Sequence, residues 1–306
     1  MSWSATLPLE GVGGEPVDLW RTIVSHGVAD LPPNRIDEDA RTLETTVAVP
    51  RGRPQTVLIR EARGGKAAVT GRAGKRSEAV LEGVRHMLRI DEDLSGFYEL
   101  AREDPDLDWV TRGAGRLMRS QTVYEDVVKT ICTTNTAWGG TVRMVNAIVE
   151  HLGEAAPGAP AEGPFGHAFP SPAAMARAPK SFYRDVARAG YRGAYLRSLA
   201  ESVASGEVDL EGLASADPDD LPDDEVAARL LALPGVGPYS AAHVMMLIGR
   251  YSRLVLDSWT RPKFASLNGG RTAKDAAIER RFRRYGRYSG LAFWLFLTRD
   301  WVAEPV

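Results

Sequence analysis

The chain has 306 residues, a formal net charge of −2 and a single cysteine, Cys132. One cysteine excludes an intramolecular disulfide, a four-cysteine iron–sulfur cluster and a zinc site built on paired thiolates, and it favours a reducing compartment. The apolar run LAFWLFL is far too short to cross a membrane, so we expect a cytoplasmic protein, at the nucleoid if the source is bacterial.

Charge is unevenly distributed along the chain. Between Arg261 and Arg287 there are nine basic residues and two acidic ones, whereas the preceding run ADPDDLPDDE is acidic. The net charge gives no global reason to expect nucleic acid, but it conceals local patches that could bind it.

The N-terminal quarter of the chain mixes two kinds of periodicity. Residues 17–27 have helical spacing, whereas apolar and polar residues alternate in three segments separated by Gly, Pro and Arg turns. These three predicted strands cover 41–50, 54–62 and 65–72. Residues 1–75 are therefore expected to form a small antiparallel β domain.

From residue 76 onward the periodicity is helical almost throughout. Predicted helices cover 76–90, 97–103, 124–132, 141–153, 182–190, 194–206 and 223–233. A Pro/Gly/Ala-rich stretch at 153–172 predicts a long surface loop. The expected fold is mainly α with an N-terminal antiparallel sheet (α+β), and residues 76–306 form its helical domain.

The stretch LPGVGPYSAAH, which begins at Leu233, predicts a tight hairpin at 233–238 between two helices. Glycines at 235 and 237 permit positive φ and close backbone approach, and Pro238 suits a first helical position. Amides at the start of the second helix can hold a phosphate. Taken alone, the hairpin fits a DNA-phosphate clamp or an ordinary structural turn.

Asp257 ends a short apolar run, LVLD, and helical spacing resumes directly after it. A carboxylate at such a junction can be the N-cap of the following helix. Its position one helix beyond the hairpin favours a catalytic role instead.

Together, the hairpin, the helix after it and Asp257 resemble the helix-hairpin-helix DNA glycosylase superfamily, whose signature is a Gly/Pro-rich hairpin followed by a catalytic aspartate. Segments 123–153, 169–178 and 190–208 look like further helices of that fold. The N-terminal sheet is similar to the extra domain of the 3-methyladenine DNA glycosylase II and 8-oxoguanine DNA glycosylase branches. The resemblance implies a monomer that acts on double-stranded DNA containing a damaged base.

The resemblance also implies roles for individual residues. Asp257 would be the catalytic carboxylate that stabilises positive charge on the sugar. It implies no cofactor, neither an iron–sulfur cluster nor zinc, but it allows a Na⁺ or K⁺ ion on the carbonyls of Leu233 and Val236. The residues expected to contact DNA are Gly235, Val236, Gly237, Tyr239, Ser240, Asn135, Arg261 and Lys263.

Tyr239 decides the expected reaction subtype. Bifunctional members of the superfamily place a Schiff-base lysine at this position, so tyrosine favours a monofunctional glycosylase that uses water. Two alternatives stay open: a lyase that uses Lys129 or Lys263, and a non-catalytic lesion-binding protein. The expected lesion is an alkylated purine or a deaminated or mismatched base, with an oxidised purine as the alternative.

Asn135 falls where 8-oxoguanine glycosylases carry an asparagine that fills the gap left by the extruded nucleotide. Phe293 falls where those enzymes carry a base-reading glutamine. The five histidines show no metal-ligand spacing, and His243 is expected to be exposed. Aromatic candidates for the base pocket are Tyr239, Trp138, Phe293 and Trp294, with Tyr124 and Tyr191 as further candidates.

Overall fold

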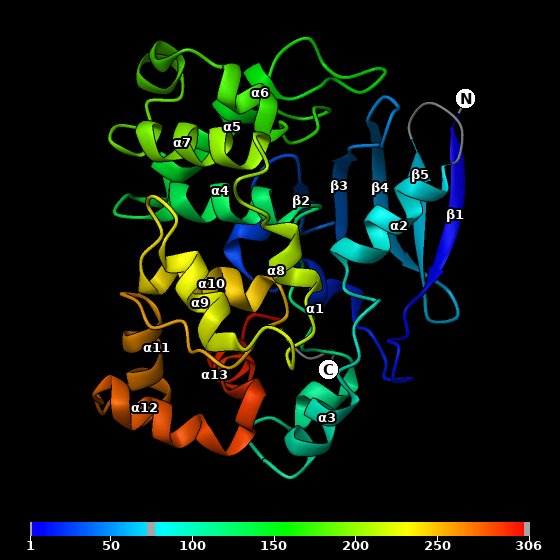
Figure 1. Ribbon diagram of the computed structural model, residues 1–306. Coiled ribbons are helices and arrows are strands. Elements are labelled where there is room, and N and C mark those ends of the chain that lie inside the picture. The colour runs from blue at the N-terminus through cyan, green and yellow to red at the C-terminus, as the bar shows by residue number, and fades with distance from the viewer. Residues whose placement is uncertain (1, 72–76, 303–306) are drawn as a thin grey trace.

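The computed structural model describes residues 2–71 and 77–302, which form one antiparallel sheet and a larger helical part (Figure 1). The sheet order is β1-β5-β4-β3-β2. Its strands are β1 (Trp3–Pro8), β2 (Arg35–Asp37), β3 (Thr42–Val47), β4 (Gln55–Ala62) and β5 (Lys66–Gly71). All three predicted strands are confirmed. The edge strand β1 and the three-residue strand β2 were not predicted, and β2 is too short to show an alternation.

Register explains which face of the sheet is buried. Leu43 pairs with Ile59, and Ile59 pairs with Val69, so one row of side chains crosses three strands. All three side chains are fully buried. The alternating pattern therefore corresponds to one face against the core in β5, whereas β3 is buried on both faces and includes the buried polar residues Glu44 and Thr46.

The remaining elements are helical. They are α1 (Leu19–Ile23), η1 (Gly27–Asp30), α2 (Glu78–Met87), α3 (Ser95–Arg102), η2 (Asp108–Arg112), α4 (Val123–Thr133), α5 (Trp138–Leu152), α6 (Pro172–Arg177), η3 (Phe182–Val186), α7 (Arg192–Ala204), α8 (Glu211–Ser215), α9 (Asp223–Leu231), α10 (Pro238–Leu247), α11 (Thr260–Leu267), α12 (Asp275–Phe282), η4 (Arg283–Tyr288) and α13 (Ser289–Thr298). The segment 153–172 is a loop, as predicted, whereas only five residues of the predicted helix 182–190 are helical, as a π-helical turn. Among the described residues, no helix has the length and apolar character needed to cross a membrane.

Helix α10 lies at the centre of the helical part. It contributes Val244 and Met245 to one apolar core and Met246 to a second. Eight of its ten residues are buried, which explains why the sequence PYSAAHVMML is apolar on nearly every side. The helix that follows the hairpin is therefore packed against both apolar cores.

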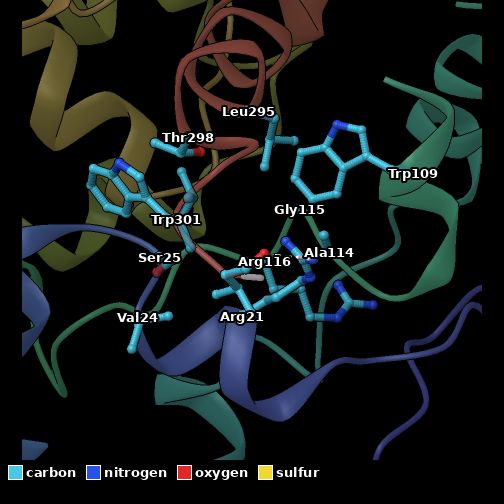
Figure 2. A pocket seen from close by; sticks show the side chains of 12 residues that line it. Arg21, Val24, Ser25, Trp109, Ala114, Gly115, Arg116, Leu295, Thr298 and Trp301 are labelled. Atoms are coloured by element: carbon cyan, nitrogen blue, oxygen red, sulfur yellow. Dashed lines mark hydrogen bonds between the residues drawn. The ribbon is translucent and has the colours of Figure 1, made fainter. Parts of the chain in front are cut away.

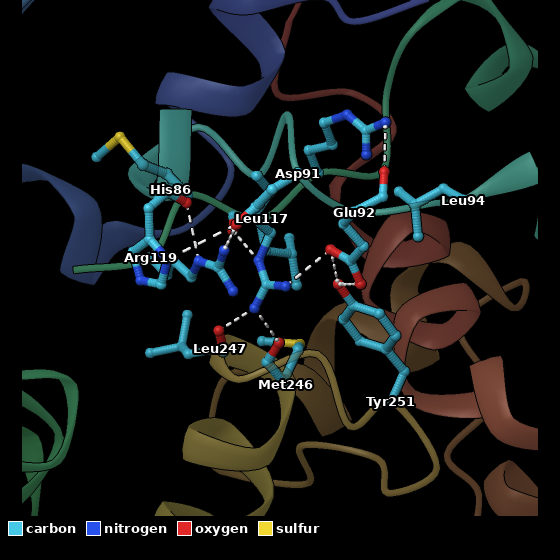
Figure 3. Close-up of polar contacts among 12 residues, drawn as sticks. His86, Asp91, Glu92, Leu94, Leu117, Arg119, Met246, Leu247 and Tyr251 are labelled. Carbon is cyan, nitrogen blue, oxygen red and sulfur yellow. Dashed lines mark hydrogen bonds and ion pairs between the residues drawn. The ribbon is translucent and has the colours of Figure 1, made fainter. Parts of the chain in front are cut away.

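A third core contains the sheet together with α2, which contributes Val80 and Val84. Arg89, two residues after α2, connects this unit to α10 through the carbonyls of Met246 and Leu247, which Figure 3 labels. Its guanidinium donates to both carbonyls and pairs with Glu92 at 2.7 Å. Arg89 is buried, so this contact satisfies the carbonyls at the end of α10 from inside the protein.

Candidate active site

The hairpin between α9 and α10 depends on Gly235. Gly235 has φ of +81°, and a Cβ there would lie 2.8 Å from the ring of Tyr195. Glycine is therefore required both for the backbone conformation and for the close approach. Gly237 differs, with φ of −102° and ψ of −177°, and a Cβ there would meet nothing within 4 Å. The expectation of positive φ is confirmed at Gly235 and wrong at Gly237.

The first turn of α10 is suited to an anion. Gly237 is its N-cap and has no side chain that could accept from the first amides, and Pro238 occupies the first turn. Uncapped amides and the positive end of the helix dipole together attract negative charge. Ser240, one of the expected contacts, has a buried side chain, so only its backbone amide could contribute.

The carbonyls of Leu233 and Val236 could accommodate a monovalent cation. Val236 donates its amide to the Leu233 carbonyl at 3.2 Å, which leaves that oxygen a second lone pair. Among the described residues, the Val236 carbonyl accepts no backbone hydrogen bond. Two carbonyl oxygens in one short turn fit a Na⁺ or K⁺ ion chemically.

Asp257 lies between an extended segment and α11, and its carboxylate has two different environments. Oδ1 accepts the amides of Trp259 at 2.8 Å and Thr260 at 2.7 Å. Oδ2 makes no hydrogen bond to any residue that the structure describes. Asp257 is half-buried, and the two amide hydrogen bonds in the turn before α11 fix its carboxylate through Oδ1, while Oδ2 stays available.

Tyr239, in the first turn of α10, is close to Asp257. Burial raises the pKa of the Tyr239 phenol, a hydrogen bond with Thr133 opposes this, and the charge of Asp257 raises the pKa further. The phenol therefore stays protonated at neutral pH. No amine occupies this position, and Tyr239 instead packs with the second apolar core.

Next to Tyr239 lies a pair of buried histidines. The ring centroids of Tyr239 and His243 are 6.0 Å apart, and those of His243 and His26 are 5.8 Å apart. Burial lowers the pKa of His243 to about 4 and that of His26 to about 3, so both rings are neutral. The expectation that His243 is exposed is wrong, because α10 is surrounded by protein at this turn.

His26 lines a cavity of about 540 Å³ whose wall also includes Gly27, Trp20, Trp138 and Trp301. Trp138, at the start of α5, is 49% exposed, and its ring lies 3.8 Å from where a Gly27 Cβ would be. The cavity is open to the surface, and its wall is aromatic on one part and charged on another, where Asp30, Glu38 and Arg41 line it. The structure places Trp138, a candidate from the sequence, in the wall of this cavity together with N-terminal residues that the sequence did not assign to it.

A tryptophan cluster connects this cavity to Asp257. Trp259, two residues after Asp257, has its ring 5.7 Å from Trp294 and 5.6 Å from Trp301. Trp294 donates Nε1 to the carbonyl of Ser25, next to His26. Trp301 also lines a small cavity of about 30 Å³ together with Thr298 and Ser25, and Figure 2 shows these three side chains.

Two aromatic predictions are wrong. Phe293 is fully buried and packs with Phe282 at 5.3 Å and Phe264 at 6.2 Å, in the core and away from the cavity. Tyr124 is buried and bonds to Met175 through its hydroxyl. Because all ten residues of α13 are buried, its sequence pattern cannot show which side chain faces a cavity.

The loop after α4 presents Asn135 to solvent with φ of +44°. Its Nδ2 donates to the hydroxyl of Tyr191 at 3.2 Å. Arg192 stabilises this loop, because its guanidinium donates to the carbonyls of Thr134 and Asn135, the latter at 2.9 Å. Arg192 could not be identified from the sequence, because its contact with Asn135 joins residues 57 positions apart.

The basic residues expected to contact DNA or to act as a lyase nucleophile are paired with acidic side chains. Arg261 binds Asp275 through two hydrogen bonds of 2.8 and 2.9 Å, and Lys263 binds Asp300 at 2.6 Å. Lys129 is fully buried and pairs with Glu125 at 2.7 Å. In the described part of the chain, no group of three or more His, Cys, Asp or Glu residues could hold a metal ion.

No protein-family model matches the sequence, and no curated protein matches it either. Solved structures do match. MBOgg1, solved in complex with a low-affinity DNA ligand, aligns with a TM-score of 0.72 and 19% identity over 97% of this chain and 96% of that one. The apo 8-oxoguanine glycosylase/lyase of Clostridium acetobutylicum aligns with a TM-score of 0.72 and 19% identity, over 96% of this chain and 95% of that chain.

A third structure, the 3-methyladenine DNA-glycosylase of Archaeoglobus fulgidus, gives a TM-score of 0.71 and 19% identity over 98% of this chain and all of that chain. The chain has the helix-hairpin-helix glycosylase fold. The fold expected from the sequence is confirmed over nearly its whole length, including the N-terminal sheet. Within the helix-hairpin-helix glycosylase fold, Asp257 follows the hairpin and its helix, as the resemblance implied.

Proposed function

We propose that this protein is a monofunctional DNA glycosylase that removes a damaged base from double-stranded DNA. The main support is Asp257, a half-buried carboxylate with Oδ1 fixed by two amides and Oδ2 unbonded in the described part of the chain. The three solved structures with the same fold are glycosylases by name or were solved with DNA.

The chemistry follows from the position of this carboxylate. Cleavage of an N-glycosidic bond develops positive charge on the sugar, and an ionised carboxylate beside that sugar stabilises the transition state. Because the N-cap bonds hold Oδ1, the carboxylate needs little reorganisation when the charge develops. Oδ2 can also orient the attacking water.

Tyr239 and the two candidate lysines favour water over an amine as the nucleophile. Tyr239 stands where a Schiff-base lysine would be needed, and both alternative lysines are engaged. Lys129 is fully buried in an ion pair with Glu125, and Lys263 binds Asp300. Release of either amine would require breaking an ion pair, so we infer a glycosylase without lyase activity.

Two surfaces would hold the DNA. The uncapped amides of α10 would bind a phosphate next to the damaged nucleotide, and a Na⁺ or K⁺ ion on Leu233 and Val236 would add positive charge there. Asn135, exposed at the tip of its loop, would enter the gap that the extruded nucleotide leaves. The aromatic cavity beside His26 would receive the base.

The proposal is tested with duplexes that each carry one lesion, incubated with purified protein and then analysed with and without alkali. We expect abasic sites, which alkali converts to strand breaks, and intact strands without alkali. Nicking without alkali together with borohydride trapping would instead assign a bifunctional enzyme. Lesion-dependent binding without abasic sites would identify a non-catalytic lesion-binding protein.

A further inference from the structure

A groove of about 630 Å³ lies between η3 and α7, apart from the cavity that contains Trp138. Its wall combines three basic side chains with three small residues. These are Lys180, Arg184 and Arg197, and Gly190, Gly193 and Ala194. Small residues let a ligand approach the backbone closely, and basic side chains attract negative charge, so this wall suits a ligand that carries phosphates.

The two elements that form the groove pack closely at Gly193. A Cβ on Gly193 would lie 2.8 Å from the Cβ of Tyr183, so only glycine lets η3 and α7 approach this far. Tyr183 is buried, and its hydroxyl donates to the carbonyl of Met175 at 2.6 Å. The backbone positions that carry Arg184 and Arg197 are therefore fixed relative to each other.

Three exposed basic side chains in and beside the groove are free. Lys180 lines the groove, Arg177 lies at the end of α6, and Arg188 lies two residues before Gly190. Within residues 2–71 and 77–302, none of the three makes a hydrogen bond or an ion pair. Each can therefore bind an anion without breaking an existing contact.

The other two basic side chains of the wall are paired, but weakly. Arg184 pairs with Asp185 at 2.7 Å, and Arg197 pairs with Glu201 at 2.9 Å. Both carboxylates are more than half exposed, and exposed ion pairs contribute little to stability. A phosphate can therefore replace either carboxylate at little cost, although Glu201 and Asp185 lower the net positive charge of the groove until then.

Helix α7 connects this groove to the surface that would contact DNA. Asn135 donates to the hydroxyl of Tyr191 at 3.2 Å, and the rings of Tyr191 and Tyr195 are 5.8 Å apart. Tyr195 in turn lies against Gly235 of the hairpin. Ala194, in the groove, precedes Tyr195 in the chain, so the groove occupies the neighbouring face of the same helix.

We propose that the groove between η3 and α7 binds the phosphodiester backbone of the duplex arm that extends from the lesion beyond Asn135. This inference rests on the proposed function. Lys180 makes the main phosphate contact, and Arg184 and Arg197 exchange their carboxylates for phosphates. Backbone contacts position a protein without reading sequence, so this surface adds affinity for DNA and no preference among lesions.

The probe is a duplex with a tetrahydrofuran abasic-site analogue, which fixes the position of the protein without requiring a known lesion. Each arm is about half a turn or about one and a half turns of double helix long. Affinity is measured for the duplex with two short arms and for both duplexes with one long arm. We expect a long arm on one particular side to raise the affinity, because that arm reaches the groove.

Lys180→Glu should cancel this gain. Affinity for the long-armed duplex should fall about fivefold or more, and the slope of log affinity against log salt should fall by about one. Arg197→Ala should also reduce the gain, whereas Glu201→Gln should increase it by freeing Arg197 for a phosphate. Arg63→Glu, in the turn between β4 and β5 on the sheet side of the molecule (Figure 1), is the matched control and should bind as the wild type does.

Two results would overturn the inference. One is an affinity that neither long arm raises, and the other is a loss in Lys180→Glu that is equal for short-armed and long-armed duplexes. Binding of a polyglutamate peptide that Lys180→Glu abolishes, with the arm-length gain unchanged, would assign the groove to an acidic protein segment instead. Because none of these measurements requires excision, a protein that shows the gain but excises no lesion contradicts the proposed function alone.

Discussion

Asp257 and Thr260 cap each other across the first turn of α11. The Thr260 amide donates to Oδ1 of Asp257 at 2.7 Å, and the Asp257 amide donates to Oγ1 of Thr260 at 2.8 Å. Thr260 is fully buried, so the pair is anchored on one side by the core. The N-cap and catalytic interpretations of Asp257 are therefore compatible, since the cap uses one carboxylate oxygen and leaves the other.

Asp257→Asn should keep the fold and DNA binding and lose catalysis. Asparagine retains an oxygen that can accept the two amides, but it carries no negative charge for the transition state. Single-turnover excision should fall by at least about 100-fold, with thermal unfolding little changed. As a control, Thr260→Ala should cost about 1 kcal/mol of stability through the lost cap. Unchanged excision by Asp257→Asn would remove this residue from the mechanism.

The two hairpin glycines should respond differently to substitution. Gly235→Ala should lower the free energy of unfolding by about 1 kcal/mol or more, because it forces positive φ on alanine and moves Tyr195. Gly237→Ala should fold normally, since its Cβ has free space. Gly237→Val should weaken binding to all DNA sequences similarly, because it enlarges the surface that would face a phosphate.

Chemical denaturation and DNA titration of the same preparations separate these effects. Equal loss of stability in both alanine variants would contradict the distinction between the two glycines.

Neutralising Asp275 should strengthen DNA binding. Arg261 is held by Asp275 through two hydrogen bonds between exposed side chains, so Asp275→Asn would leave its charge available for a phosphate. The slope of log affinity against log salt should steepen by about one. The double variant Asp275→Asn with Arg261→Ala should lose this gain. If it keeps the gain, the effect comes from the removed negative charge and not from Arg261.

Asn135 should determine sensitivity to the base opposite the lesion. Its amide can donate to and accept from the unpaired base, so Asn135→Ala should reduce excision and flatten the preference for the opposite base. Tyr191→Phe removes only the hydroxyl that Asn135 contacts and should have a smaller effect. Excision rates for one lesion against each of four opposing bases measure both. An unchanged preference in Asn135→Ala would exclude this role.

Stability should fall on acidification below pH 6.5 because of the two buried histidines. Burial lowers the pKa of His26 to about 3 and of His243 to about 4 in the folded protein, whereas the unfolded chain takes up protons near pH 6.5. The unfolded state therefore binds more protons between pH 6.5 and pH 4. Each histidine should therefore lower the free energy of unfolding by about 1.4 kcal/mol for each pH unit of acidification in this range.

Asp126 has the opposite effect, because burial raises its pKa to about 6 and the folded state gains protons first. Comparison of His243→Gln with the wild type isolates one histidine, since Asp126 is common to both. Urea unfolding at pH 7, 6 and 5 should show a shallower loss in the variant. Parallel pH curves for the two proteins would mean that His243 does not titrate in the expected range.

The fold was predictable because its signals are local, and the candidate site was proposed from local signals too. Alternating residues identified β3, β4 and β5, helical spacing identified most helices, and the PGVG turn with Asp257 one helix later indicated the candidate site. Each of these features depends on backbone conformation or on residues close together in the chain. Tyr239, in the same segment, could be recognised for the same reason.

The cavity wall could not be predicted, because tertiary packing brings together residues far apart in the chain. His26 and His243 come from opposite ends of the sequence, and neither has a local pattern that distinguishes it from an exposed histidine. Phe293 and Trp294 are neighbours on a fully buried helix, yet only Trp294 contacts the tryptophan cluster. On such a helix every direction is apolar, so only the packed structure decides which side chain contacts the tryptophan cluster.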